Sequence, residues 1–277
     1  MTVDWNSNDS SKRFGVPATP QVSRTLLAAS SEGGEGGEGG EGGEGGGTAA
    51  SGEGGEGGEA GIAGADVLHD PVAYLTALDV IAAHVIAGRE VYRAGQIEAG
   101  SEMFAHAISE IYVEIEEPLE ELGATPFIAT LEQLLDLSLS ADGTVERIDA
   151  ASADALAALD EAAGHRPPGE RGDAAIEARV VAEMLDRAAR QYRVAQDSGN
   201  PESHIDGYGF SEAARIRFGK ARASIEALDS DAAAVLADAT QTIEKAFATA
   251  EPPTAYTIPV GEPLVAASRA VLAASRH

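Results

Sequence analysis

The chain has no cysteine among its 277 residues. This absence excludes disulfides, thiolate metal sites and cysteine nucleophiles, so only the harder nitrogen and oxygen ligands remain for a metal ion. Aromatic residues make up 5% of the chain, and alanine and leucine dominate the apolar set. We therefore expect a core of closely packed helices with small side chains, and strands are hard to find in the sequence.

Basic residues are scarce as well. The chain has 46 acidic and 19 basic residues, only three of them lysines, and its formal net charge is −27. A surface of this sign repels nucleic acid and anionic membranes. We therefore expect no nucleic acid as a partner, whereas cations and basic proteins suit the charge.

Long apolar runs are also missing. No run approaches the roughly 18 to 20 residues of a membrane span, so we expect no membrane insertion. Residues 1–30 are polar and interrupted by proline, which is not the pattern of a standard secretory signal. The short apolar segment 26–30 is either the end of a signal whose start is missing or a small disordered patch.

Glycine, in contrast, is abundant in one tract. Residues 31–60 repeat Glu-Gly-Gly, with five copies over 32–46 and a second run over 53–59. Glycine raises the entropy of the unfolded chain, and evenly spaced glutamates repel one another. We predict a disordered segment over residues 1–65, which acts as a linker, and one all-α helical domain over residues 66–277.

Apolar periodicity and capping residues predict an all-α antiparallel bundle of about seven helices, followed by a short terminal helix. The expected ranges are about 70–94, 96–121, 126–135, 144–163, 173–196, 211–228, 230–250 and 264–275. Residues 92–96 and 192–196 resemble each other, and each ends a helix before a hairpin turn. This suggests two related halves that each contain a hairpin.

One face of the predicted helix 96–121 collects acidic residues and a histidine at spacings of four, four, four and three. They are Glu102, His106, Glu110, Glu114 and Glu117. His84, in the preceding helix, lies as far before residue 95 as His106 lies after it. In an antiparallel hairpin the two imidazoles should therefore sit level.

Imidazole and carboxylate groups on facing helices are how helix bundles build iron, manganese or zinc sites. We therefore expect a divalent metal or iron as cofactor, with Tyr112 on another side of the helix. The predicted ligands are His84, His106, Glu110, Glu102 and Glu114. Gly88, placed opposite Glu102, would leave room between the helices. The alternative is a solvated acidic stripe with two structural histidines.

Several catalytic signatures are absent. A ferritin-like di-iron site needs two Glu-x-x-His motifs, whereas Glu102 and His106 are four residues apart. The zinc-hydrolase motif His-Glu-x-x-His, phosphate loops and nucleophile elbows do not occur either. Oxygen-activating di-iron chemistry and zinc hydrolysis are therefore disfavoured.

A second candidate lies at residues 200–210, which we interpret as a turn. His204 with Glu202 and Asp206 could coordinate a cation there. In the structural alternative, which we weigh more heavily, Asp206 or Ser211 caps the helix that follows.

The same region resembles the helical periplasmic domains associated with bacterial iron permeases and the imelysin-like proteins. The matching residues are Tyr192, Asn200, Asp206, Gly209, Phe210 and Ala213. In the first half, the residues similar to a histidine-containing hairpin of such proteins are His84, Gly88, Tyr92, Gly95 and His106. The chain departs from the family pattern at Gln191 and at 203–204, and the imelysin motif Gly-x-His-x-x-Glu is absent.

The resemblance implies a soluble, non-catalytic helical protein that handles iron or another metal outside the cytoplasm. We predict a metal-binding protein of the cell envelope that binds or delivers a cation, with a metal ion as ligand and an envelope protein as partner. A scaffold with an acidic tether and a metalloenzyme with an open coordination position are the alternatives. The expected location is periplasmic or extracellular, and the cytoplasm is the alternative because no standard export signal is present.

Overall fold

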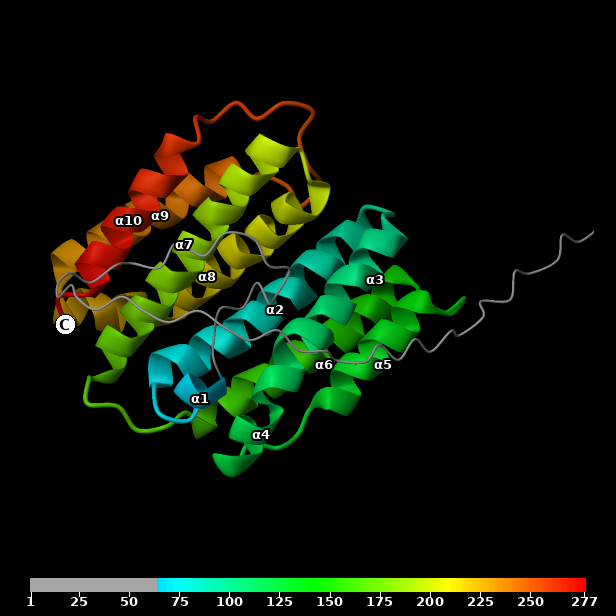
Figure 1. Cartoon of the computed structure of the whole chain (residues 1–277), viewed down its shortest axis with the longest axis horizontal. Helices are drawn as coiled ribbons and strands as arrows, with labels where there is room; N and C mark the ends of the chain where they lie inside the picture. The colour runs from blue at the N-terminus through cyan, green and yellow to red at the C-terminus, as the bar shows by residue number, and fades with distance from the viewer. Residues whose placement is uncertain (1–63) are drawn as a thin grey trace, which may run out of the picture. The chain divides into compact units, whose positions relative to one another are not determined.

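A computed structural model describes residues 64–277, and in this range the chain forms helices and no strand (Figure 1). The elements are α1 (Gly64–Val67), α2 (Pro71–Arg93), α3 (Ile97–His106), the π-helix η1 (Ala107–Tyr112), α4 (Val113–Glu121), α5 (Ile128–Leu139), α6 (Val145–Ala162), the 3-10 turn η2 (Ala163–His165), α7 (Asp173–Ser198), α8 (Pro201–Leu228), α9 (Ser230–Ala246) and α10 (Gly261–Ala274). The predicted all-α bundle is confirmed. The prediction of disorder up to residue 65 concerns mostly residues 1–63, which lie outside the described range.

The predicted caps define the hairpin that carries both histidines. The Asp70 carboxylate accepts a hydrogen bond of 2.8 Å from the Val72 backbone N–H, and Pro71 opens α2. Gly95, between α2 and α3, has a φ of 86°, a conformation that glycine adopts without strain. The predicted hairpin turn around residue 95 is therefore confirmed.

The second arm of the hairpin contains an irregular turn. Helical structure continues from Ile97 to Glu121, close to the predicted range, but residues 107–112 form a π-helix. Its hydrogen bonds join residues i and i+5, one residue further apart than in an α-helix. Residues after this segment therefore lie on a different helical face from the one that an uninterrupted α-helix would give them. Such segments are frequent at functional sites, and this one lies directly after His106.

Helix α8 corrects one prediction. It starts at Pro201 rather than near residue 211, and the Asn200 side chain caps it by accepting a 3.1 Å hydrogen bond from the Glu202 backbone. The interpretation of 200–210 as a turn, and of Asp206 or Ser211 as a cap, was therefore wrong. Glycines 207 and 209 suggested a turn, but they lie within the helix where neighbouring elements come very close.

The helices form two groups that meet at α2 (Figure 1). Helix α2 packs against α3 and α6 in the first group and against α7 and α8 in the second. The hairpins α2–α3 and α7–α8 thus lie together at the centre, whereas α9 and α10 pack on α7. The relationship between the two halves stays a prediction.

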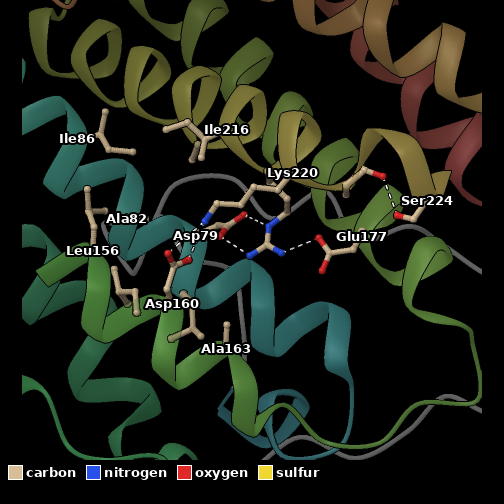
Figure 2. A pocket seen from close by; sticks show the side chains of 15 residues that line it. Asp79, Ala82, Ile86, Leu156, Asp160, Ala163, Glu177, Ile216, Lys220 and Ser224 are labelled. Atoms are coloured by element: carbon tan, nitrogen blue, oxygen red, sulfur yellow. Dashed lines mark hydrogen bonds and ion pairs between the residues drawn. The ribbon is translucent and has the colours of Figure 1, made fainter. Parts of the chain in front are cut away.

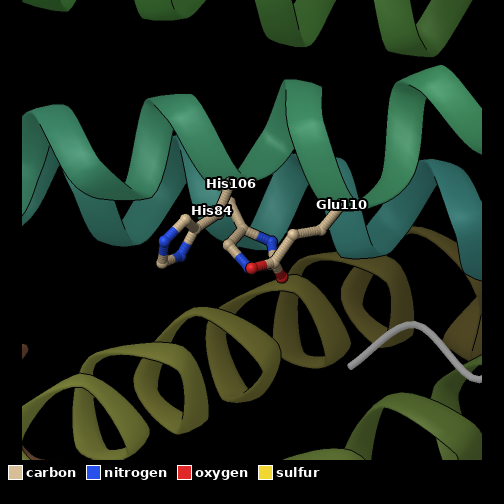
Figure 3. A group of neighbouring side chains, drawn as sticks. All are labelled: His84, His106 and Glu110. Carbon is tan, nitrogen blue, oxygen red and sulfur yellow. The ribbon is translucent and has the colours of Figure 1, made fainter. Parts of the chain in front are cut away.

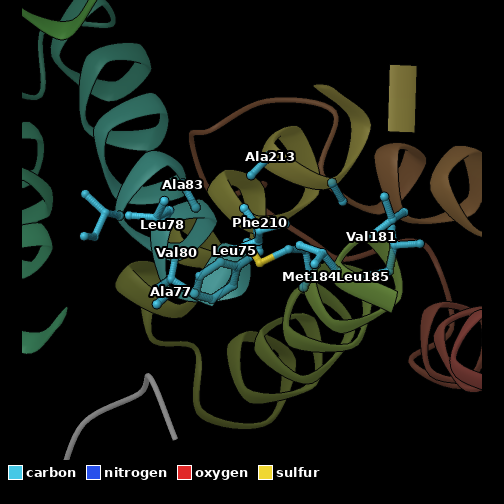
Figure 4. Close-up of a cluster of buried hydrophobic side chains, with 14 of the residues drawn as sticks. Leu75, Ala77, Leu78, Val80, Ala83, Val181, Met184, Leu185, Phe210 and Ala213 are labelled. Atoms are coloured by element: carbon cyan, nitrogen blue, oxygen red, sulfur yellow. The ribbon is translucent and has the colours of Figure 1, made fainter. Parts of the chain in front are cut away.

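Helix α2 is also both long and apolar. By length and composition it could cross a membrane, so the expectation that no segment approaches a span was too strict. Within the bundle, however, 78% of its most apolar window is buried, as in the core helix of a soluble protein. Figure 4 shows why: Leu75 of α2 meets Met184 of α7 and Phe210 of α8 in one cluster.

Glycine sets the distance between α2 and α3. A Cβ atom added to Gly88 would lie 2.7 Å from the Phe104 ring and 2.9 Å from the Gly100 carbonyl oxygen. The two backbones therefore approach closely at this level. Gly88 faces Gly100 and Phe104 rather than Glu102, so the expectation that it leaves room for a carboxylate was wrong.

Candidate metal centre

Three predicted residues converge between the two arms of the first hairpin (Figure 3). His84 lies on α2, His106 ends α3, and Glu110 lies on the π-helix. One ligand atom from each residue lies within 4.8 Å of the other two. The two imidazole rings are 6.2 Å apart, as expected for histidines that sit level in the hairpin.

His84 is held in one orientation. Its Nδ1 lies 2.8 Å from the Val80 carbonyl oxygen, which can only accept a hydrogen bond, so we assign the proton to Nδ1. The Nε2 lone pair then faces the Asp206 carboxylate of α8, whose Oδ1 lies 3.7 Å away. A backbone carbonyl that fixes the outer nitrogen is the common second partner of a metal-ligating histidine.

The inner nitrogen of His84 is buried without a donor. The residue is 2% exposed, and among the described residues its Nε2 has no hydrogen-bond partner. Burial, and then the positive charges of His106 and Arg187, lower the pKa of His84 to about 4, against a partial rise from the Val80 hydrogen bond. At neutral pH His84 is therefore uncharged and has a lone pair available for a cation.

Helix α8 adds two carboxylates that sequence reasoning had placed in a loop. Asp206 is 4% exposed, and its Oδ1 lies 3.7 Å from His84 Nε2. Glu202, one helical turn earlier, places Oε1 at 3.5 Å from His106 Nδ1. Each histidine therefore faces one α8 carboxylate. The Asn-Pro start of the helix was the signal that could have placed them on one face.

The charges of the group suit a dication. Glu110, Glu202 and Asp206 contribute three negative charges when ionised, and Arg187 contributes one positive charge that acts on His84. A divalent cation would be attracted by these carboxylates and would bond to both nitrogen and oxygen donors.

The donor atoms need a small adjustment to share one ion. Bonds of about 2.1 Å to nitrogen or oxygen place two ligands at most about 4.2 Å apart, compared with the observed limit of 4.8 Å. The side chain of His106 is 23% exposed and Glu110 is half-buried. These two side chains are therefore less deeply buried than His84, which supplies a fixed point.

Two predicted ligands lie outside this group. Glu102 and Glu114 are exposed. Glu102 lies one helical turn before His106, but its exposed side chain is not among those whose ligand atoms come within 4.8 Å of one another in the described residues. Glu114 follows the π-helix, where the face changes. Tyr112 packs on Phe127 at 4.8 Å between ring centres, on another side as predicted.

His204 does not join Glu202 and Asp206. Its Nε2 lies 3.0 Å from the Thr249 carbonyl oxygen, and its Nδ1 lies 3.4 Å from the Tyr256 hydroxyl. Burial lowers its pKa. The structure thus divides the second predicted cluster, because the two acids face the first hairpin and the histidine faces the segment after α9.

Comparison of the chain with known protein families, with curated proteins and with solved structures gave no match.

Proposed function

We propose that this protein binds a divalent transition-metal ion between α2, α3–η1 and α8, and that it holds or delivers the ion. The observation that supports this most strongly is the buried Nε2 of His84. It has no hydrogen-bond donor among the described residues, and with Nδ1 bonded to Val80 it lies 3.7 Å from Oδ1 of Asp206. A bound cation would satisfy this nitrogen and reduce the repulsion between the nearby carboxylates.

Iron(II) is our first candidate among the metals. Two histidines and one carboxylate form a ligand set typical of non-haem iron(II), and the absence of cysteine removes the soft sulfur ligands that select other metals. Manganese and zinc accept the same donor types. A role in the cell envelope, with a protein of that compartment as the recipient, is part of the proposal and is supported by the sequence resemblance.

Simple binding is favoured over catalysis by the number of donors. His84, His106 and Glu110 offer three donors that lie close together, and Asp206 and Glu202, each beside one of the histidines, could each add a donor once the side chains close on the ion. Closed coordination is typical of structural sites, whereas catalytic sites keep a position open. No nucleophile or cofactor loop accompanies the group in the sequence.

The test is elemental analysis of the full chain after anaerobic incubation with iron(II), zinc, manganese or copper and gel filtration. We expect close to one equivalent of metal, and a hundredfold excess over Kd should raise the free energy of unfolding by about 2.7 kcal/mol. The double variant His84→Ala/His106→Ala should lose both effects.

Two variants serve as matched controls. His204→Asn removes a buried histidine outside the group, and Glu114→Gln removes an exposed carboxylate of the same helical run. Both should keep the metal. Absence of metal from the wild-type chain, together with unchanged melts for all four ions, would refute the proposal.

A metalloenzyme is the second candidate. It is favoured if only His84, His106 and Glu110 bind the ion, because three ligands leave positions open for oxygen or water. Oxygen consumption by the iron-loaded chain, abolished in Glu110→Gln, would support this alternative. Stable iron(II) loading without turnover would support simple binding.

A further inference from the structure

A cavity lies beside α2, apart from the candidate metal centre. Its volume is about 450 Å³, and residues of α2, α6, α7 and α8 line it (Figure 2). None of its lining residues belongs to the candidate metal centre. The volume is in the range of sites that hold small organic molecules.

The lining combines apolar walls with a row of charges. The walls include Leu78, Ala82, Ile86, Leu156, Leu159 and Ile216. Arg217 makes two contacts with the Asp79 carboxylate, one of them 2.6 Å from Nη2 to Oδ1. Its Nη1 lies 2.7 Å from Oε2 of Glu177. Figure 2 shows these groups together beside the apolar side chains.

The charges of the lining do not cancel. Asp79, Asp160 and Glu177 are opposed by Arg217 and Lys220, which leaves one negative charge when all five are ionised. The side chains of Asp79 and Arg217 are only 13% and 15% exposed, so water screens them weakly. An additional cation in this cavity would therefore be attracted, and an additional anion repelled.

The carboxylates retain acceptor capacity. Each carboxylate oxygen has two lone-pair directions, and Arg217 uses one direction on each Asp79 oxygen. Within residues 64–277, Oε1 of Glu177 accepts no hydrogen bond. An ammonium group has three N–H donors, which these oxygens could receive without separating Arg217 from Asp79.

We propose that this cavity binds a small amphiphilic amine, with its ammonium group at Glu177 and Asp79 and its apolar body against the walls formed by α2 and α6. A carboxylate or phosphate ligand would have to displace Glu177 or Asp79 from Arg217. It would also have to approach a chain with a net charge of −27. An amine would leave the contacts of Arg217 in place, and although Arg217 and Lys220 repel it, the three carboxylates of the lining attract it.

The probe for this site is n-octylamine, compared with octanoate and octanol as matched anionic and neutral ligands. Calorimetry and thermal melts are run on the full chain with a chelator present. We expect octylamine to bind and to raise the melting temperature, and the other two ligands to bind at least about tenfold more weakly, because a hydrogen-bonded charge distinguishes them.

Three variants locate the site. Glu177→Gln should weaken octylamine binding about tenfold or more. Ala82→Leu should also weaken it, because the added side chain occupies the cavity beside the half-buried Ala82. Asp197→Asn, which removes an equal charge from an exposed position outside the cavity, should leave the affinity unchanged.

Several results would overturn the proposal. These are octylamine binding that is equal to that of octanol, binding that Glu177→Gln and Ala82→Leu leave intact, preferential binding of octanoate, or no binding of any ligand. The double variant His84→Ala/His106→Ala should bind octylamine like the wild type. This cavity is therefore tested separately from the metal centre.

Discussion

Acidification is expected to destabilise the folded chain through His84. In the unfolded chain this imidazole takes up a proton near its ordinary pKa of 6.5, whereas in the fold its pKa is about 4. Between these values the unfolded chain binds more protons, so stability is complete above about pH 6.5 and falls as the pH drops through this window. The 2.5 units, at about 1.36 kcal/mol each, give a loss of about 3 kcal/mol.

The perturbation is His84→Asn. Asparagine does not titrate, and its amide can still donate to the Val80 carbonyl one turn earlier, in place of the Nδ1–H group. We expect roughly 2 kcal/mol of the His84 contribution to disappear between about pH 7 and pH 5 in the wild type but not in the variant. Urea denaturation of both chains, in the presence of a chelator, measures this difference at each pH.

The comparison isolates His84 from other groups. Burial also lowers the pKa of His204, which destabilises the fold on acidification in the same direction, but this contribution is common to both chains. Equal slopes of unfolding free energy against pH in the wild type and His84→Asn would refute the reasoning. His84 would then not be held neutral by burial.

Three further predictions concern packing and capping. Gly209→Ala should destabilise the chain by about 1 to 3 kcal/mol in urea denaturation, because the new Cβ would collide with the Ala83 carbonyl on α2. Arg217→Met should lower the free energy of unfolding by about 3 kcal/mol, since it leaves the Asp79 carboxylate buried without its partner. The double variant Arg217→Met/Asp79→Leu should recover part of this stability, because it removes the buried charge as well. Asn200→Ala should lower the free energy of unfolding by about 1 kcal/mol and reduce the helical circular dichroism signal, because it removes the cap of α8. For each of the three positions, an unchanged midpoint of urea denaturation would show that the contact does not stabilise the fold.

Local signals predicted the first hairpin well. Asp70 and Pro71 mark its start, Gly95 marks its turn, and the level position of His84 and His106 follows from counting residues on either side of the turn. These features depend on sequence neighbours alone. The π-helix could not be predicted in this way, because no glycine or proline marks the residues where its hydrogen-bond pattern replaces that of the α-helix.

The α8 carboxylates were missed because glycine has two uses. In the sequence Gly207 and Gly209 have the character of turn residues, whereas in the fold they admit the Phe247 ring and the α2 backbone. Only the tertiary arrangement distinguishes these uses. If residues 200–210 formed a turn, nothing in the sequence would place Asp206 on a helix beside His84. The predicted metal site therefore contains residues of one hairpin alone.

The glycine contacts on either side of α2 have a consequence for ion selection. Gly88 meets the Gly100 carbonyl and the Phe104 ring of α3, and Gly209 meets the Ala83 carbonyl of α2 from α8, so backbone contacts help to space both elements that face His84. A backbone contact leaves less room for adjustment than a contact between leucine side chains. If the group binds an ion as proposed, a change of metal would therefore come from exchanging the donor atoms at His106, Glu110 or Asp206 while the distances between the helices stayed the same.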